Sequence, residues 1–148
     1  MKDRVTYGFV AGILGALVPF VINYGSRALE LTTLVWADFM GLFIMGKRPE
    51  TTFEMAFFIG SQFVFLGLLG SVFALILPFI TSQHLLFKGA LYGVAVWFIL
   101  FSLPFLQQLP ELENVPLKTS LTHLVSSLLW GMAMAFILKR IDKKVTIV

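Results

Sequence analysis

Four stretches of the chain contain no Asp, Glu, Lys or Arg, and each is long enough to form a membrane-crossing helix. They cover residues 5–26, 55–87, 89–110 and 119–138. A bilayer core of about 30 Å needs about 20 apolar residues in a helix that rises about 1.5 Å per residue. The pattern therefore predicts an all-α integral membrane protein made of one membrane domain, residues 1–148. Its four transmembrane helices are expected at about residues 5–26, 55–80, 86–106 and 119–138.

A shorter apolar segment, residues 31–46, lies between the first two predicted spans and carries Asp38 near its middle. Segments of this length are more often interfacial, re-entrant or core helices than spans. We expect a short interfacial or re-entrant helix that lies on or dips into the outer leaflet, held there by Trp36. Five spans are the alternative that the pattern leaves open.

The composition agrees with a membrane protein. Hydrophobic residues make up 58% of the chain and charged residues 13%, about half of the charged fraction that is usual in soluble domains. Mean hydropathy is +0.91. The basic residues lie at the ends of the predicted spans and form no patch, so we expect the lipid bilayer, and no nucleic acid, as a partner.

The distribution of Lys and Arg predicts the orientation. One side of the four spans holds the larger share: Lys2, Arg4, Lys88, Lys139, Arg140, Lys143 and Lys144. The other side holds the smaller share: Arg27, Lys47, Arg48 and Lys118. Positive residues favour the cytoplasmic side, so both termini are expected in the cytoplasm. The loop at residues 107–118, with Glu111 and Glu113, is then expected to face outward.

Small residues recur at helical spacing in all four predicted spans. The packing positions that we single out are Gly8, Gly12, Gly67, Gly70, Gly89, Gly93, Ser127, Gly131 and Ala135. Such residues make a helix face flat, so that the backbones of two helices can approach closely. The pattern predicts a tight bundle. The faces can meet within one chain, in a homo-oligomer, or against another membrane protein.

The second half of the chain also resembles the first. At an offset of 61, residues 60–77 align with residues 121–138, and six of the 18 pairs are identical, among them Gly70 with Gly131. At an offset of 81, the GxxxG of Gly8 and Gly12 aligns with that of Gly89 and Gly93. Because both halves would have the same orientation, the pattern is that of a parallel repeat of two helical hairpins.

Several polar residues fall in the outer part of the predicted membrane region: Asn23, Asp38, Glu54, Gln62 and His123. Polar groups at such a depth usually face the interior of a bundle and pair with one another. Our hypothesis is a small polar cavity open to the outer side, with Asp38 and His123 as its titratable pair. The alternative is that these residues only join helices together.

No catalytic residue is assigned. The chain has no cysteine, which excludes thiol catalysis and disulfides. It has two histidines. A zinc site needs three or more nitrogen, oxygen or sulfur ligands, and would require His123, Asp38 and Glu54 to meet. We therefore expect neither a metal site nor a cofactor.

Four short sequences carry a resemblance to known proteins: residues 8–12 (GFVAG), 36–39 (WADF), 88–98 (KGALYGVAVWF) and 126–132 (SSLLWGM). With these the chain resembles small bacterial multi-span membrane proteins of the YqhR-like and YagU-like families. The resemblance implies a location in the bacterial plasma (inner) membrane and transfers no catalytic residue.

These observations leave three classes of function. The first expectation is a non-enzymatic assembly or accessory component of the membrane, favoured by the small-residue faces and short loops. The alternative is a small transporter or channel with an outer-leaflet polar cavity. The second alternative is an intramembrane enzyme, for which the sequence offers no nucleophile and base at a suitable spacing.

Overall fold

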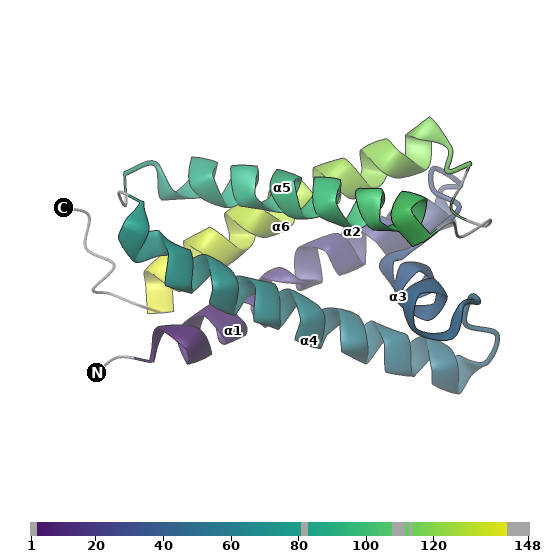
Figure 1. The fold of residues 1–148 in the computed structure, drawn as a ribbon, viewed down its shortest axis with the longest axis horizontal. Helices are drawn as coiled ribbons and strands as arrows, with labels where there is room; N and C mark the ends of the chain where they lie inside the picture. Colours follow the sequence, from purple (N-terminus) through teal and green to yellow (C-terminus); the bar gives the residue numbers. More distant parts are fainter. Residues whose placement is uncertain (1–2, 81–82, 108–111, 113, 142–148) are drawn as a thin grey trace.

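The computed structural model describes residues 3–80, 83–107, 112 and 114–141. Its long helices run lengthwise in a bundle, and the first described helix begins at the same end at which the last one finishes (Figure 1). We call this the terminal end, and the opposite end, where the short helix α3 (Trp36–Met45) lies, the α3 end. The elements are α1 (Arg4–Gly15), α2 (Leu17–Ala28), α3 (Trp36–Met45), α4 (Thr52–Ile76), the 3₁₀ turn η1 (Leu77–Phe79), α5 (Leu85–Gln107) and α6 (Leu117–Ile141).

The all-helical prediction is confirmed for the described residues, none of which is in a strand. Four helical segments are long and apolar enough to cross a membrane: Arg4–Ala28, Thr52–Phe79, Leu85–Leu103 and Leu117–Ile141. Residues 108–111 and 113 of the loop predicted to face outward, and residues 142–148 with the end of the basic C-terminal cluster, lie outside the described residues.

The first of these segments is broken at Ala16, which separates α1 from α2. Proline has no N–H, so Pro19 cannot donate to the carbonyl of Gly15, the bond that a continuous helix would make there. The backbone also passes close to α6 at this point, because a Cβ on Gly15 would lie 3.1 Å from the backbone nitrogen of Met134. The break therefore occurs where the first segment approaches the last helix.

Two helix pairs are packed through the predicted small-residue faces. A Cβ on Gly12 of α1 would lie 2.3 Å from the carbonyl oxygen of Leu66 on α4. A Cβ on Gly93 of α5 would lie 2.1 Å from the carbonyl oxygen of Ser127 on α6. Real Cβ atoms do not come this close, so these glycines permit backbone contact between the helices. These faces meet within a single chain.

The two contacts are related by the offsets found in the sequence. Gly12 and Gly93 differ by 81 positions, and their partners Leu66 and Ser127 differ by 61. The same offsets relate the contact of Gly8 with the Gly70 carbonyl, at 2.5 Å, to that of Gly89 with the Gly131 carbonyl, at 2.4 Å. The α1–α4 and α5–α6 pairs are thus two copies of one packed helical hairpin.

The short helix α3 is enclosed by the bundle. Every residue from Leu34 to Leu42 is buried, and α3 packs against α4. Trp36, expected as an interfacial anchor, is buried against the ring of His123, with their centroids 4.9 Å apart. Whether α3 lies on the outer leaflet or dips into it stays a prediction.

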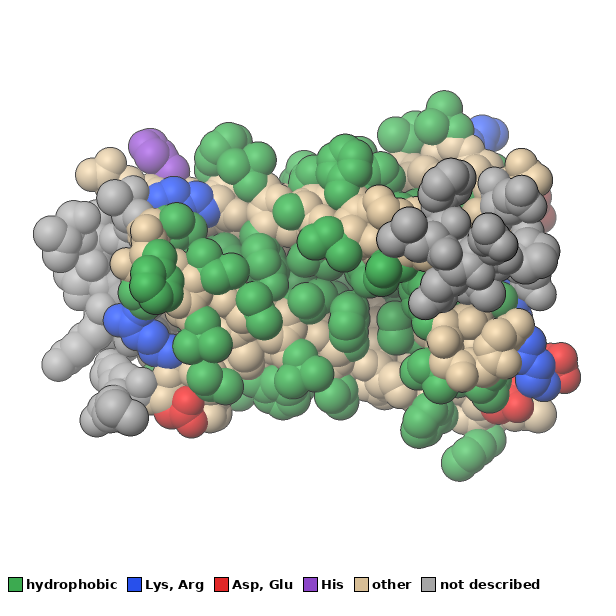
Figure 2. Space-filling view, in the orientation of Figure 1, with side chains coloured by type: hydrophobic (Ala, Val, Ile, Leu, Met, Phe, Trp, Pro, Cys, Tyr) green, Lys and Arg blue, Asp and Glu red, His purple; other side chains and the backbone are tan. Residues whose placement is uncertain are grey.

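Side chains of different kinds are separated along the bundle. On the face in Figure 2, hydrophobic side chains cover the middle of the molecule, and acidic and basic side chains gather toward its two ends. Many of the apolar residues in the middle are exposed, for example Val64, Leu68 and Phe98. An exterior with an apolar belt and charged ends has the chemistry that a bilayer requires.

Candidate functional site

His123 lies at the centre of a buried polar group at the α3 end. Its exposed fraction is 0%, and its Nε2 lies 2.9 Å from the carbonyl oxygen of Leu34. A carbonyl only accepts, so Nε2 carries the proton and donates, and in the neutral ring Nδ1 is then an acceptor. Nδ1 is buried and has no hydrogen-bond partner within the described part of the chain.

Aromatic rings surround this imidazole. The ring centroids of Trp36, Phe39 and Phe101 lie 4.9, 5.1 and 5.7 Å from that of His123. Trp36 and Phe39 meet it at nearly a right angle, in an edge-to-face arrangement, which is favourable for ring pairs. The rings come from α3 and α5, so side chains of three helices meet around the imidazole.

Asn23 of α2 joins the same group. Its Nδ2 donates to the Pro19 carbonyl at 2.7 Å and to Ser126 Oγ at 3.1 Å. Ser126 is three residues from His123 and donates to the His123 carbonyl at 3.1 Å, so the two lie on neighbouring turns of one face. Asn23 Oδ1 is buried and, among the residues that the structure describes, has no partner. Asn23, His123 and Ser126 are called the polar cluster below.

The backbone before α3 is tied to α6 beside the polar cluster. Thr119 is buried, and its Oγ1 accepts from the backbone N–H of Thr33 at 3.1 Å. The Thr32 hydroxyl donates to the Leu34 carbonyl at 2.7 Å. That carbonyl therefore accepts from both Thr32 and His123, which uses both of its lone pairs.

Asp38 reaches the polar cluster indirectly. Its Oδ2 accepts from Arg27 Nη1 at 3.1 Å and from the backbone N–H of Val35 at 2.9 Å. The side chain of Asp38 is 2% exposed and that of Arg27 is 45% exposed. The Val35 N–H and the Leu34 carbonyl belong to one peptide group, so Asp38 and His123 bind opposite sides of the same peptide.

The structure does not bring Glu54 to the polar cluster. Its Oε2 accepts the backbone N–H groups of Glu50 and Thr51 at 2.7 and 3.1 Å, while Thr51 Oγ1 accepts the Glu54 N–H at 3.1 Å. This is a capping box at the start of α4. Within the described ranges, no three His, Cys, Asp or Glu side chains are placed to hold a metal ion.

Gln62 of α4 is buried, and no hydrogen bond joins its side chain to the polar cluster. Neither polar atom of the Gln62 side chain has a partner among the described residues. At the repeat offset of 61, Gln62 is the counterpart of His123.

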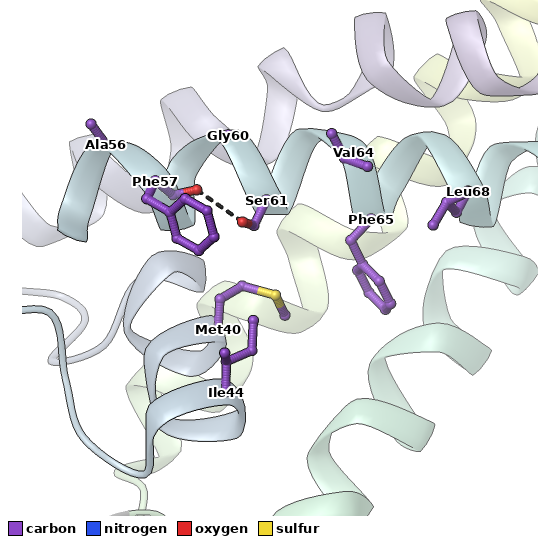
Figure 3. A pocket seen from close by; sticks show the side chains of 9 residues that line it. All are labelled: Met40, Ile44, Ala56, Phe57, Gly60, Ser61, Val64, Phe65 and Leu68. Carbon is purple, nitrogen blue, oxygen red and sulfur yellow. Dashed lines mark hydrogen bonds between the residues drawn. The ribbon is translucent and has the colours of Figure 1, made fainter. Parts of the chain in front are cut away.

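A separate groove lies between α3 and α4, with a volume of about 590 Å³. Figure 3 shows Met40 and Ile44 of α3 facing Phe57, Ser61 and Phe65 of α4 across it. The Ser61 hydroxyl is turned to its own helix and donates to the Phe57 carbonyl at 2.9 Å. The groove is lined by apolar side chains and includes no member of the polar cluster.

Two residues near the site, Arg27 and Trp97, were not predicted from the sequence to belong to it. Arg27 was interpreted only as a topology marker, although its spacing of four from Asn23 places both on one face of a helix. Trp97 was not among the predicted site residues. Its Nε1 is buried without a partner in the described ranges. Gly93 of α5 contacts Ser127 of α6. Trp97 lies one turn from Gly93, and His123 lies one turn from Ser127, so Trp97 and His123 lie at the same level of the α5–α6 pair.

Comparison of the chain with protein-family models, curated proteins and solved structures found no match. The family resemblance stays a prediction. The function is therefore argued from the geometry of the site.

Proposed function

We propose that the protein crosses the bacterial inner membrane four times and moves a proton or a small hydrogen-bond donor through the polar cluster. Both termini are placed in the cytoplasm, so the α3 end faces outward. Four long apolar helices support the four crossings, and the excess of Lys and Arg at the terminal end supports the orientation. The proposal involves no covalent chemistry.

The observation that carries the proposal is the pair of unpartnered acceptors, His123 Nδ1 and Asn23 Oδ1. A buried polar atom without a hydrogen bond costs about 1–3 kcal/mol, so such atoms call for a partner or a role. Both atoms are acceptors, and the species that satisfies them must donate a hydrogen bond. Polar residues inside a membrane domain often mark the path of a proton or substrate.

The packing of the glycines changes the order of the first two functional classes. The expectation of an assembly component rested on the small-residue faces. The helix faces that carry Gly8, Gly12, Gly89 and Gly93 are packed against other helices of the same chain. They no longer argue for self-association, whereas the polar cluster still calls for a role.

An accessory role is the second candidate, and one glycine favours it. A Cβ on Gly60 would meet nothing within 4 Å, and Gly60 lies in the groove between α3 and α4. A helix of another membrane protein would find close backbone approach there. A second membrane protein retained through purification in mild detergent would favour this candidate over transport.

An enzymatic role has the least support. His123 and Ser127 are spaced by four on α6, but within the described residues the imidazole has no hydrogen bond to a hydroxyl, and the Ser126 hydroxyl donates to the His123 backbone carbonyl at 3.1 Å. A nucleophile needs its base within hydrogen-bond reach of the hydroxyl. We therefore propose that the protein is not an enzyme.

Proton flux into reconstituted vesicles tests the proposal. Vesicles with internal potassium, valinomycin and an internal pH-sensitive dye should acidify faster with the wild-type protein than without protein. His123→Phe keeps an aromatic ring among Trp36, Phe39 and Phe101 but removes the acceptor, so its rate should fall to that of protein-free vesicles.

His84→Ala is the matched control, because His84 is the second histidine and is exposed in the turn before α5. This variant should keep the wild-type rate. Wild-type flux no faster than that of empty vesicles, or equal flux in His123→Phe, would refute proton transport through this site.

A further inference from the structure

Four groups form a continuous hydrogen-bonded chain from the surface to the polar cluster. Arg27 Nη1 donates to Asp38 Oδ2 at 3.1 Å, and the Val35 N–H donates to the same oxygen at 2.9 Å. On the other side of that peptide, the Leu34 carbonyl accepts from His123 Nε2 at 2.9 Å. The chain begins at a half-exposed guanidinium and ends at an imidazole that is completely buried.

We infer that Asp38 is the positioning residue of His123, acting through the Leu34–Val35 peptide to keep Nδ1 as the free acceptor. The inference rests on the proposed function for its purpose, since that acceptor is the atom assigned to the transported species. It adds a mechanism for how the acceptor is maintained and brings Arg27 into the site.

The physical basis is the polarity of the peptide group. A carboxylate that accepts the N–H of a peptide increases the negative charge on the carbonyl oxygen of that peptide, because hydrogen bonds in a chain polarise one another. The Leu34 carbonyl then becomes a stronger acceptor for the Nε2–H of His123. With the proton held on Nε2, the lone pair of a neutral imidazole must lie on Nδ1.

Geometry reinforces this polarisation. Asp38 lies in the first turn of α3 and accepts the N–H of Val35, the N-cap residue just before the helix. A carboxylate at this position is stabilised by the helix dipole and satisfies a free N–H group. Asp38 thereby fixes the Leu34–Val35 peptide relative to α3, and the Leu34 carbonyl stays directed at α6.

Nitrogen NMR of the two histidines tests the inference without a transport assay. Protein labelled with ¹⁵N-histidine in the His84→Ala background should give one imidazole, protonated at Nε2. In Asp38→Ala, the Nε2–H signal should be lost or joined by an Nδ1–H form, because the peptide is no longer held.

Asp38→Asn is the variant that preserves folding, since the amide oxygen can still accept the Val35 N–H. Its loss of charge should leave the proton on Nε2 but shift the Nε2–H resonance upfield, as expected for a weaker hydrogen bond. Thr33→Val is the matched control, because Thr33 bonds Thr119 and not the Leu34 peptide, and its spectrum should match that of the background protein.

An unchanged tautomer in folded Asp38→Ala, or an unchanged Nε2–H resonance in Asp38→Asn, would overturn the inference. These outcomes differ from failure of the proposed function. A protein with no proton flux but with the expected changes in its spectra would lose the transport proposal and keep Asp38 as the positioning residue.

Discussion

Replacing Gly93 with alanine is expected to lower the free energy of unfolding by about 1–3 kcal/mol or more, the usual cost of overpacking. The added Cβ would lie 2.1 Å from the Ser127 carbonyl oxygen. This atom belongs to the backbone of α6 and cannot turn aside as a side chain can, so the helices must separate. The loss should appear as a lower unfolding temperature in detergent.

Gly60→Ala is the matched control on α4. Its Cβ would meet nothing within 4 Å, and alanine favours a helix over glycine by about 1 kcal/mol. This variant should be as stable as the wild type or more stable. If Gly93→Ala unfolds at the wild-type temperature, or Gly60→Ala loses as much stability, the close α5–α6 contact is wrong.

Arg27→Ala is expected to destabilise the protein by about 3 kcal/mol, near the lower end for breaking a buried ion pair. The variant leaves the carboxylate of Asp38, which is 2% exposed, without its cation. Two facts keep the loss near the lower end: Arg27 is itself 45% exposed, and the Val35 N–H still donates to Asp38. Asp38→Asn should cost less, because the guanidinium that it leaves unpaired can reach water.

Lys47→Ala provides the comparison for this ion pair. Lys47 and Glu50 form a pair at 3.3 Å with side chains 48% and 71% exposed, and exposed pairs contribute about 0–1 kcal/mol. Unfolding temperatures of the three variants should fall in the order Lys47→Ala, Asp38→Asn, Arg27→Ala, with the last the least stable. An Arg27→Ala protein as stable as Lys47→Ala would contradict the buried pair.

The long helices were predictable because a bilayer-length run without charge is a strong and local signal. The predicted span at 119–138 and the observed helix Leu117–Ile141 differ by at most three residues at either end. The repeat offsets aligned Gly12 with Gly93 and Gly70 with Gly131, and the structure places these glycines in equivalent contacts. Which helices meet was not predictable, since a flat face fits equally well against the same chain or another one.

The position of α3 was not predictable for a related reason. An apolar segment of that length suits a leaflet surface and a protein interior alike, and hydropathy does not distinguish between them. At the site, the structure places Asn23, Asp38 and His123 at one end of the bundle, where hydrogen bonds connect them through the backbone, and their role in a cavity stays a prediction. The interpretation of Glu54 overlooked the Thr51-x-x-Glu54 pattern, which is a local capping signal.

If a polar species can reach the polar cluster from outside, a thiol placed there by Ser126→Cys should be open to labelling. The chain has no cysteine, so a single introduced thiol is the only target for a small cationic methanethiosulfonate reagent that does not cross membranes. Met134→Cys is the control, because both residues are on α6 and both are 0% exposed. In intact cells, we expect the protein with Ser126→Cys to react with the reagent from outside and the protein with Met134→Cys not to react. Equal inertness of the two thiols would contradict such access.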